Sequence, residues 1–168
     1  MDKQRPRTLV ATCGNVMASD DAFGPMVARE LRSHALPSVE VIDLDIRPAA
    51  LLDYLPGKDG LILVDAVHAP GLEPGRVLDI DWFSPDRPGL VNDDTMSTHG
   101  LSLAMQLNLA RSLDLLPPHV RLIALSIEPT RVGQTASEHL AAAVGKAVDL
   151  VTKRATYGSA PAAEQQHA

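Results

Sequence analysis

Aromatic side chains and cysteine are both scarce in this chain of 168 residues. Aromatics make up 3% of the residues, so the chain lacks the stacking platforms with which proteins bind single-stranded nucleic acids. The single cysteine, Cys13, excludes an internal disulfide framework and a multi-cysteine zinc site. Lys and Arg total 15 against 21 Asp and Glu, a net charge of −6. Because duplex binding needs a cationic face, this balance argues against a nucleic-acid partner.

Long hydrophobic runs are absent as well. No apolar stretch approaches the ~20 residues that a membrane-spanning helix needs, and the N-terminal sequence MDKQRPRTLV has no hydrophobic signal core. The apolar fraction of 45% and the charged fraction of 21% are ordinary for a globular protein. We therefore expect a cytoplasmic monomer that binds neither membranes nor nucleic acid. We expect one α/β domain over residues 1–156 and a flexible C-terminal tail at 157–168.

Short apolar runs predict the strands. Most of these runs lack clean alternation, as is typical of strands covered on both faces, and they lie at residues 8–13, 39–44, 60–67 and 120–127. Residues 76–82 (RVLDIDW) instead alternate with period two. This pattern predicts a half-exposed edge strand, paired antiparallel through the turn at 71–75.

Helical spacing and capping signals predict the segments between the strands. A helix begins near Pro25, where a proline is harmless in the first turn, and a short helix follows at 49–54. After a loop at 84–98, the next helix covers 101–113 with Thr98 as its N-cap. A capping box at 135–138 opens the last helix. Alternating strands and helices predict a three-layer α/β fold, with helices on both faces of a mainly parallel or mixed sheet of about five strands.

Polar side chains gather where these strands end. Asp20 and Asp21 follow the first strand, Asp65 ends the apolar run LILV, and His99 opens the helix after the long loop. The carboxyl ends of parallel strands share one edge of a sheet, and ligands bind there. Asp21, Asp65 and His99 are therefore expected to lie within reach of one divalent cation, such as zinc, nickel, iron or manganese.

Each of these residues also has a structural interpretation. Asp20 is best explained by a favourable interaction with a helix N-terminus, and His99 could bond to nearby backbone. Asp65 is harder to explain in this way, because a buried acid is costly unless it is paired or bound. His68 could donate to it as the structural alternative to a metal site. Cys13 is interpreted as a small core residue and not as a nucleophile.

Three motifs carry a resemblance to a known family. They are GNVMASDDAFG at residues 14–24, LILVDAV at 61–67 and STHGLSLAMQL at 97–107. In order and spacing they resemble the hydrogenase maturation proteases, endopeptidases that remove a C-terminal extension from the large subunit of [NiFe]-hydrogenases. The similarity extends from about Thr8 to Val151.

The resemblance implies a function and a partner. It identifies Asp21, Asp65 and His99 as the metal-binding residues and, through the metal, as the catalytic ones. The metal implied is nickel carried by the substrate, the hydrogenase large-subunit precursor, or another divalent metal in its absence. Two other functions stay open on the residues alone: a noncatalytic module for hydrogenase assembly, and a different α/β hydrolase with its own metal.

Overall fold

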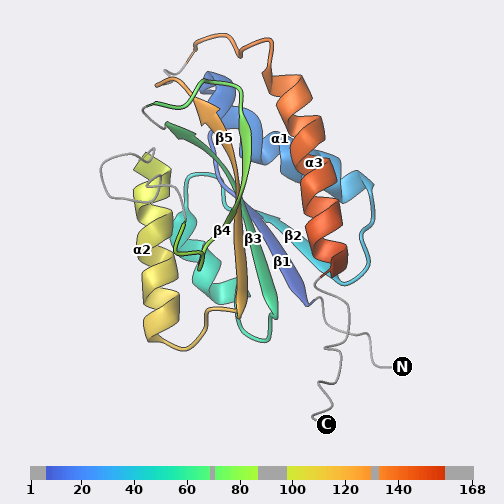
Figure 1. The fold of residues 1–168 in the computed structure, drawn as a ribbon, viewed down its shortest axis with the longest axis vertical. Helices are drawn as coiled ribbons and strands as arrows, with labels where there is room; N and C mark the ends of the chain where they lie inside the picture. The colour runs from blue at the N-terminus through green and yellow to red at the C-terminus, as the bar shows by residue number, and fades with distance from the viewer. Residues whose placement is uncertain (1–6, 69–70, 87–97, 130–132, 158–168) are drawn as a thin grey trace.

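A computed structural model describes residues 7–68, 71–86, 98–129 and 133–157, and within these ranges the chain forms a five-stranded sheet with helices on both faces (Figure 1). The predicted α/β architecture is confirmed. The elements run in the order β1 (Thr8–Thr12), η1 (Ser19–Ala22), α1 (Phe23–Ser33), β2 (Val39–Asp43), η2 (Pro48–Tyr54), β3 (Gly60–His68), β4 (Val77–Asp81), α2 (Thr98–Ser112), β5 (His119–Ile127) and α3 (Leu140–Tyr157), where η1 and η2 are 3-10 helices. The predicted loop at 84–98 lies largely outside the described residues, as does the tail beyond Tyr157.

The strand order in the sheet is β2-β1-β3-β5-β4. The first four of these strands pair in parallel, and β4 pairs antiparallel with β5. The predicted antiparallel edge strand is confirmed, but its predicted pairing through the preceding turn is wrong. Because β3 is already flanked by β1 and β5, its two edges are occupied, and β4 takes the free edge of β5.

The two faces of the sheet are covered by different helices. Leu61 and Leu63 of β3 pack with α2 and η2, whereas Ile62 and Val64 pack with α1 and α3. Figure 1 shows α2 and η2 on one side of the sheet and α1 and α3 on the other. The alternation along β3 therefore assigns each of its odd-numbered side chains to the α2 face.

No helix in the described ranges is both long and apolar enough to cross a membrane.

The segment before α3 differs from its prediction. The capping box at 135–138 does not open the helix, which begins at Leu140. The Ser19 hydroxyl donates to the Thr135 carbonyl at 3.0 Å, and the Ser137 N–H donates to the Asp20 carboxylate at 2.7 Å. These bonds tie residues 135–137 to η1. They also give Asp20, which lies in the first turn of η1, a partner in this distant segment.

A shared carboxylate joins three elements at the β4 side of the sheet. Asp79 of β4 accepts from the Nε atom of Arg121 in β5 at 2.7 Å and from the Nε atom of Arg154 in α3 at 2.8 Å. Its side chain is 14% exposed. Because one half-buried acid compensates two guanidinium groups, its removal leaves both without their common partner.

We predict that Asp79→Ala lowers the free energy of unfolding by about 1–3 kcal/mol, the cost of leaving partly buried polar groups unpaired. Urea unfolding of the purified variant measures this change. Asp81→Ala is the matched control, because Asp81 is 52% exposed and lies 3.7 Å from Arg121. Exposed pairs contribute little, so the control should change the stability by less than about 1 kcal/mol. Equal losses for the two variants would contradict the prediction.

Candidate functional site

Asp65 is fully buried near the carboxyl end of β3. One of its oxygens, Oδ1, accepts a hydrogen bond from the Ala66 N–H at 2.9 Å. The other, Oδ2, is buried and has no hydrogen-bond partner. Burial, followed by the negative charge of nearby Asp21, raises the pKa of Asp65 to about 8. The carboxyl group is therefore protonated over much of the neutral range, and it ionises readily only when a positive charge or a donor arrives.

Asp21 lies in η1, directly after the loop that follows β1, and is 5% exposed. Its Oδ2 atom accepts from the Asn15 N–H at 3.0 Å, and its carbonyl accepts from the same N–H at 3.1 Å. η1 contacts β3, and the charge of Asp21 contributes to the raised pKa of Asp65. The structure thus brings together two of the three residues that the sequence predicted at this edge.

Two glycines of the first motif bring η1 and the start of α1 close to the residues directly after β1. Gly14 has φ +144°, and a Cβ atom there would lie 2.1 Å from the Asp21 carbonyl oxygen. A Cβ atom on Gly24 would lie 2.0 Å from the carbonyl oxygen of Cys13. Neither position has room for a side chain, because both obstacles are backbone atoms. The close approach of these backbones holds Asp21 against the end of the sheet.

The first turn of α2 begins at the same edge. The helix starts at Thr98, so His99 belongs to its first turn. The His99 side chain lies outside the described residues. Figure 1 shows α2 starting at the side of the molecule where β3 and β5 end. Asp65, as an odd-numbered residue of β3, is on the sheet face that α2 covers.

The structural alternative for Asp65, a hydrogen bond from His68, is wrong. Residues three apart in a strand point to opposite faces of the sheet. The His68 Nδ1 atom lies 3.2 Å from the Ile127 carbonyl oxygen, which can only accept, so His68 donates to β5. Asp65 therefore keeps its unpartnered oxygen.

Cys13 lies beside the acidic pair but offers no thiolate. It is fully buried and packs in the core on the α2 face. Burial raises the pKa of the Cys13 thiol far above its usual range, and the charges of Asp65, Asp43 and Asp21 add to this effect. The thiol stays protonated and is neither a nucleophile nor a metal ligand. The prediction that Cys13 is a core residue is confirmed.

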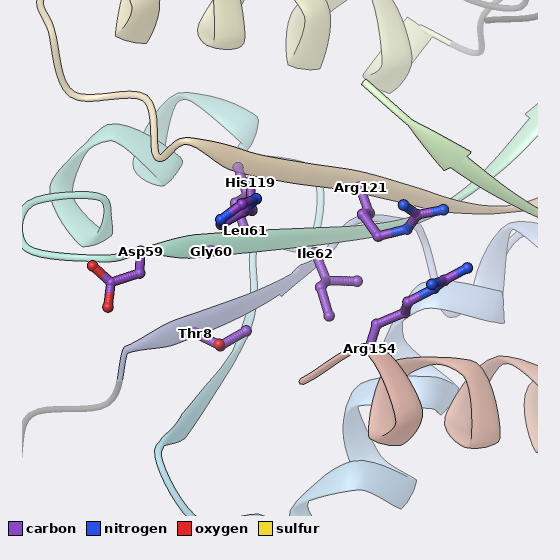
Figure 2. A pocket seen from close by; sticks show the side chains of 8 residues that line it. All are labelled: Thr8, Asp59, Gly60, Leu61, Ile62, His119, Arg121 and Arg154. Carbon is purple, nitrogen blue, oxygen red and sulfur yellow. The ribbon is translucent and has the colours of Figure 1, made fainter. Parts of the chain in front are cut away.

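A small pocket lies at the opposite edge of the sheet (Figure 2). Its volume is about 50 Å³, and Thr8, Gly60 and His119 line it at the starts of their strands. The two carboxyl groups described above are at the other ends of these strands. This pocket is therefore separate from the candidate site.

Two residues near the acids were not singled out from the sequence. Asn15 donates its N–H to Asp21, and Ser126 of β5 is a fully buried serine whose Oγ atom has no hydrogen-bond partner. The signal for Asn15 was its place in the first motif. For Ser126, the signal was a hydroxyl residue in the otherwise apolar end of VRLIALSI.

Among the side chains that the structure describes, no group of three His, Cys, Asp or Glu residues is arranged to hold a metal ion. Asp21 and Asp65 are two such side chains, one fewer than a group of three requires. The unpartnered Oδ2 atom of Asp65 and the mutual repulsion of the two acids fit a cation, since a positive charge would relieve both. A complete set needs a further donor, which His99 or a bound partner can supply.

The fold and this edge define an α/β protein with two adjacent carboxyl groups at the ends of its parallel strands. A family model described as hydrogenase maturation protease matches residues 25–156. A Methanocaldococcus jannaschii protein provisionally named as such a protease is 30% identical over 151 residues, which are 85% of this chain and 92% of that protein. The hydrogenase 2 maturation protease of Escherichia coli is 29% identical over 128 residues, 73% of this chain and 76% of that one.

Solved structures agree with these sequence matches. The hydrogenase maturating endopeptidase HybD of Escherichia coli has a TM-score of 0.80 at 24% identity, and the match covers 91% of this chain and 94% of that one. The solution structure of an Escherichia coli endopeptidase has a TM-score of 0.76 at 26% identity, covering 89% and 93%. The chain belongs to the hydrogenase maturation protease family, a family of enzymes that cleave peptide bonds.

We predict that Gly24→Ala lowers the free energy of unfolding by at least about 2 kcal/mol, because the new methyl group collides with the backbone of Cys13, directly after β1. Gly145→Ala is the matched control, since Gly145 is also a helical glycine but a Cβ atom there would meet nothing within 4 Å. It should raise stability by about 0.5–1 kcal/mol through helix propensity. Chemical denaturation of the two variants tests the pair, and a Gly24→Ala protein as stable as the control would contradict it.

The raised pKa of Asp65 predicts a pH-dependent stability. In the unfolded chain Asp65 loses its proton near its ordinary pKa of about 3.9, whereas the folded protein keeps it up to about pH 8. Folding thus takes up a proton between these values, and the contribution of Asp65 to stability falls as the pH rises through this window.

Asp65→Asn removes this titration, so its melting temperature should fall less than that of the wild type between about pH 5 and pH 8. Thermal unfolding at several pH values measures the difference. Asp149→Asn, at an exposed position of α3, is the control and should follow the wild type. Parallel curves for Asp65→Asn and the wild type would show that the carboxyl group titrates normally.

Proposed function

We propose that this protein is an endopeptidase that removes the C-terminal extension of a [NiFe]-hydrogenase large-subunit precursor and recognises the nickel already bound to that precursor. Family membership supports peptide-bond cleavage in hydrogenase maturation. The observation that carries the finer proposal is the buried, unpartnered oxygen of Asp65 beside Asp21, at the edge where α2 begins. Such a site is short of positive charge.

The donor set supports a cation that arrives with the substrate. Two carboxylates and one imidazole, from Asp21, Asp65 and His99, hold free nickel weakly compared with thiolate-rich sites. The protein's own thiol, Cys13, is kept protonated and does not compete. Nickel held on thiolates of the precursor would therefore bring the partners together through its open coordination positions.

The same geometry can perform the cleavage. Nickel bound beside the scissile peptide can polarise its carbonyl group or orient the attacking water. A positive charge beside Asp65 would lower its raised pKa and favour the carboxylate, which could then bind the cation or accept a proton from the attacking water. Asp21 is better suited to be a fixed ligand than a proton acceptor, because its Oδ2 atom already accepts the Asn15 N–H. Cleavage would then depend on nickel loading of the precursor.

We predict that Asp65→Ala or His99→Ala abolishes processing of a nickel-loaded precursor while the protein stays folded. Each variant removes one donor from the set that would hold the substrate's nickel. Mass spectrometry of the large subunit, with and without nickel, measures the loss of its C-terminal extension. The wild type should act only on the loaded precursor.

His119→Ala is the matched control, because His119 is an exposed histidine at the opposite end of the sheet. It should process the precursor like the wild type. Undiminished cleavage by both site variants would overturn the proposal. Tight binding of the unprocessed precursor without peptide release would instead favour a noncatalytic assembly module. Stoichiometric zinc in the purified protein would favour a hydrolase with its own metal.

A further inference from the structure

The outward face of α2, the side turned away from the sheet in Figure 1, carries large apolar side chains. Met105 and Leu109 of this helix and Leu113 directly after it are between 44% and 67% exposed. The Leu113 N–H donates to the Leu109 carbonyl at 3.0 Å, so the helical turn continues to Leu113. Side chains four residues apart share one face of a helix, so the three form one line, which we call the α2 stripe. Leu103 and Leu107 lie on the buried face of the same helix and pack in the core.

The other two long helices have charged outward faces. Within the described ranges, neither α1 nor α3 exposes a large apolar side chain. Their exposed positions include Arg29, Glu30, Arg32, Lys146, Asp149 and Lys153. In α2, by contrast, Arg111 is the only Asp, Glu, Lys or Arg residue. Single apolar residues on a surface are ordinary, but an aligned and nearly uncharged set is typical of a contact surface.

Exposed apolar side chains also lie on the segment that leads to Asp21. Val16 and Met17, in the loop between β1 and η1, are 61% and 68% exposed. The first turn of α2 contains His99, and Met105 follows six residues later, about 9 Å along the helix axis. Exposed apolar side chains therefore occur on both of the segments that carry Asp21 and His99.

The protein that is cleaved is the occupant that suits this position. Under the proposed function, the hydrogenase large-subunit precursor must bring its nickel to the end of the sheet where α2 begins. The α2 stripe extends away from that end for about 12 Å along the helix, so a precursor seated at the site can continue onto it. A second copy of this chain fits less well. Three side chains fall far short of the ~800 Å² that each partner buries in a stable interface, whereas in the precursor complex they add to the contacts at the site.

We propose that the α2 stripe docks an apolar, weakly charged surface of the hydrogenase large-subunit precursor. The inference rests on the proposed function and adds to it a second contact, separate from nickel recognition. Because burial of apolar surface needs no metal, the stripe contributes to the affinity for loaded and unloaded precursor alike. It holds the precursor against the site, where Asp21, Asp65 and His99 then respond to nickel.

Two charge substitutions in the stripe test this role. Met105→Glu and Leu109→Lys should each raise the Kd for the nickel-free precursor at least about tenfold, because each brings a charge into an apolar contact. Titration calorimetry with the unprocessed precursor measures the Kd. With the nickel-loaded precursor, KM should rise by a similar factor while kcat stays within about twofold. The two substitutions have opposite charges, so a loss in both reports the apolar contact and not repulsion from one charge on the precursor.

Phe83→Glu is the matched control. Phe83 is a large apolar side chain, 48% exposed, that follows β4 at the opposite end of the sheet. This variant should leave Kd and KM within about twofold of the wild type. The melting temperatures of all three variants should stay within about 2 °C of the wild type, because substitutions of exposed side chains change stability little.

The outcomes separate this inference from the function on which it rests. Wild-type Kd and KM in both stripe variants, or equal losses in Phe83→Glu, overturn the docking surface and leave the peptidase proposal standing. A wild-type dimer in sedimentation that Leu109→Lys converts to monomers, with the Kd for the precursor unchanged, assigns the stripe to a second copy and overturns it too. Stripe-dependent binding without cleavage of the loaded precursor supports the docking surface and overturns the peptidase proposal. A wild type that does not bind the precursor overturns both.

Discussion

Burial of Asp65 beside Asp21 is the constraint on which the rest of the site depends. The interior of the sheet removes the Asp65 carboxyl group from water, and the Ala66 N–H satisfies one of its two oxygens. Ionising it there is unfavourable because of burial and the neighbouring negative charge. In the isolated protein, the Asp65 carboxyl group stays neutral by keeping its proton. In a complex, a cation could stabilise its ionised form. The burial of Asp65 therefore allows two states of its carboxyl group: protonated, or ionised beside a cation.

The rest of the fold stabilises this unfavourable arrangement. Aliphatic side chains of β3 pack on both faces of the sheet, Leu61 and Leu63 toward α2 and Ile62 and Val64 toward α1 and α3. Their burial contributes on the order of 1.5–3 kcal/mol for each large side chain, and several such side chains together exceed the cost of one unpartnered carboxyl oxygen. The burial of these aliphatic side chains therefore allows β3 to tolerate the unfavourable burial of Asp65.

Much of this arrangement could be predicted from the sequence, for identifiable reasons. The apolar run before Asp65 indicated both the strand and the burial of the acid, and the carboxyl-edge rule placed Asp21 nearby. The partner of β4 could not be predicted, because a turn does not reveal that both edges of β3 are taken. The start of α3 could not be predicted either, because long-range bonds from Ser19 and Asp20 occupy its supposed cap. A local pattern contains no information about such distant partners.

Electrostatics also relates the site to the order of events in a maturation reaction. A buried carboxyl group that holds a proton has little affinity for a cation, so binding a cation must expel that proton. Under the proposed function, the donor set of Asp21, Asp65 and His99 would bind a free ion poorly, whereas an ion presented on a docked protein would act at high effective concentration. Such a site would respond to a metal and its carrier together. Under the proposed function, an enzyme with these residues would leave an unloaded precursor intact without needing a separate sensor for nickel.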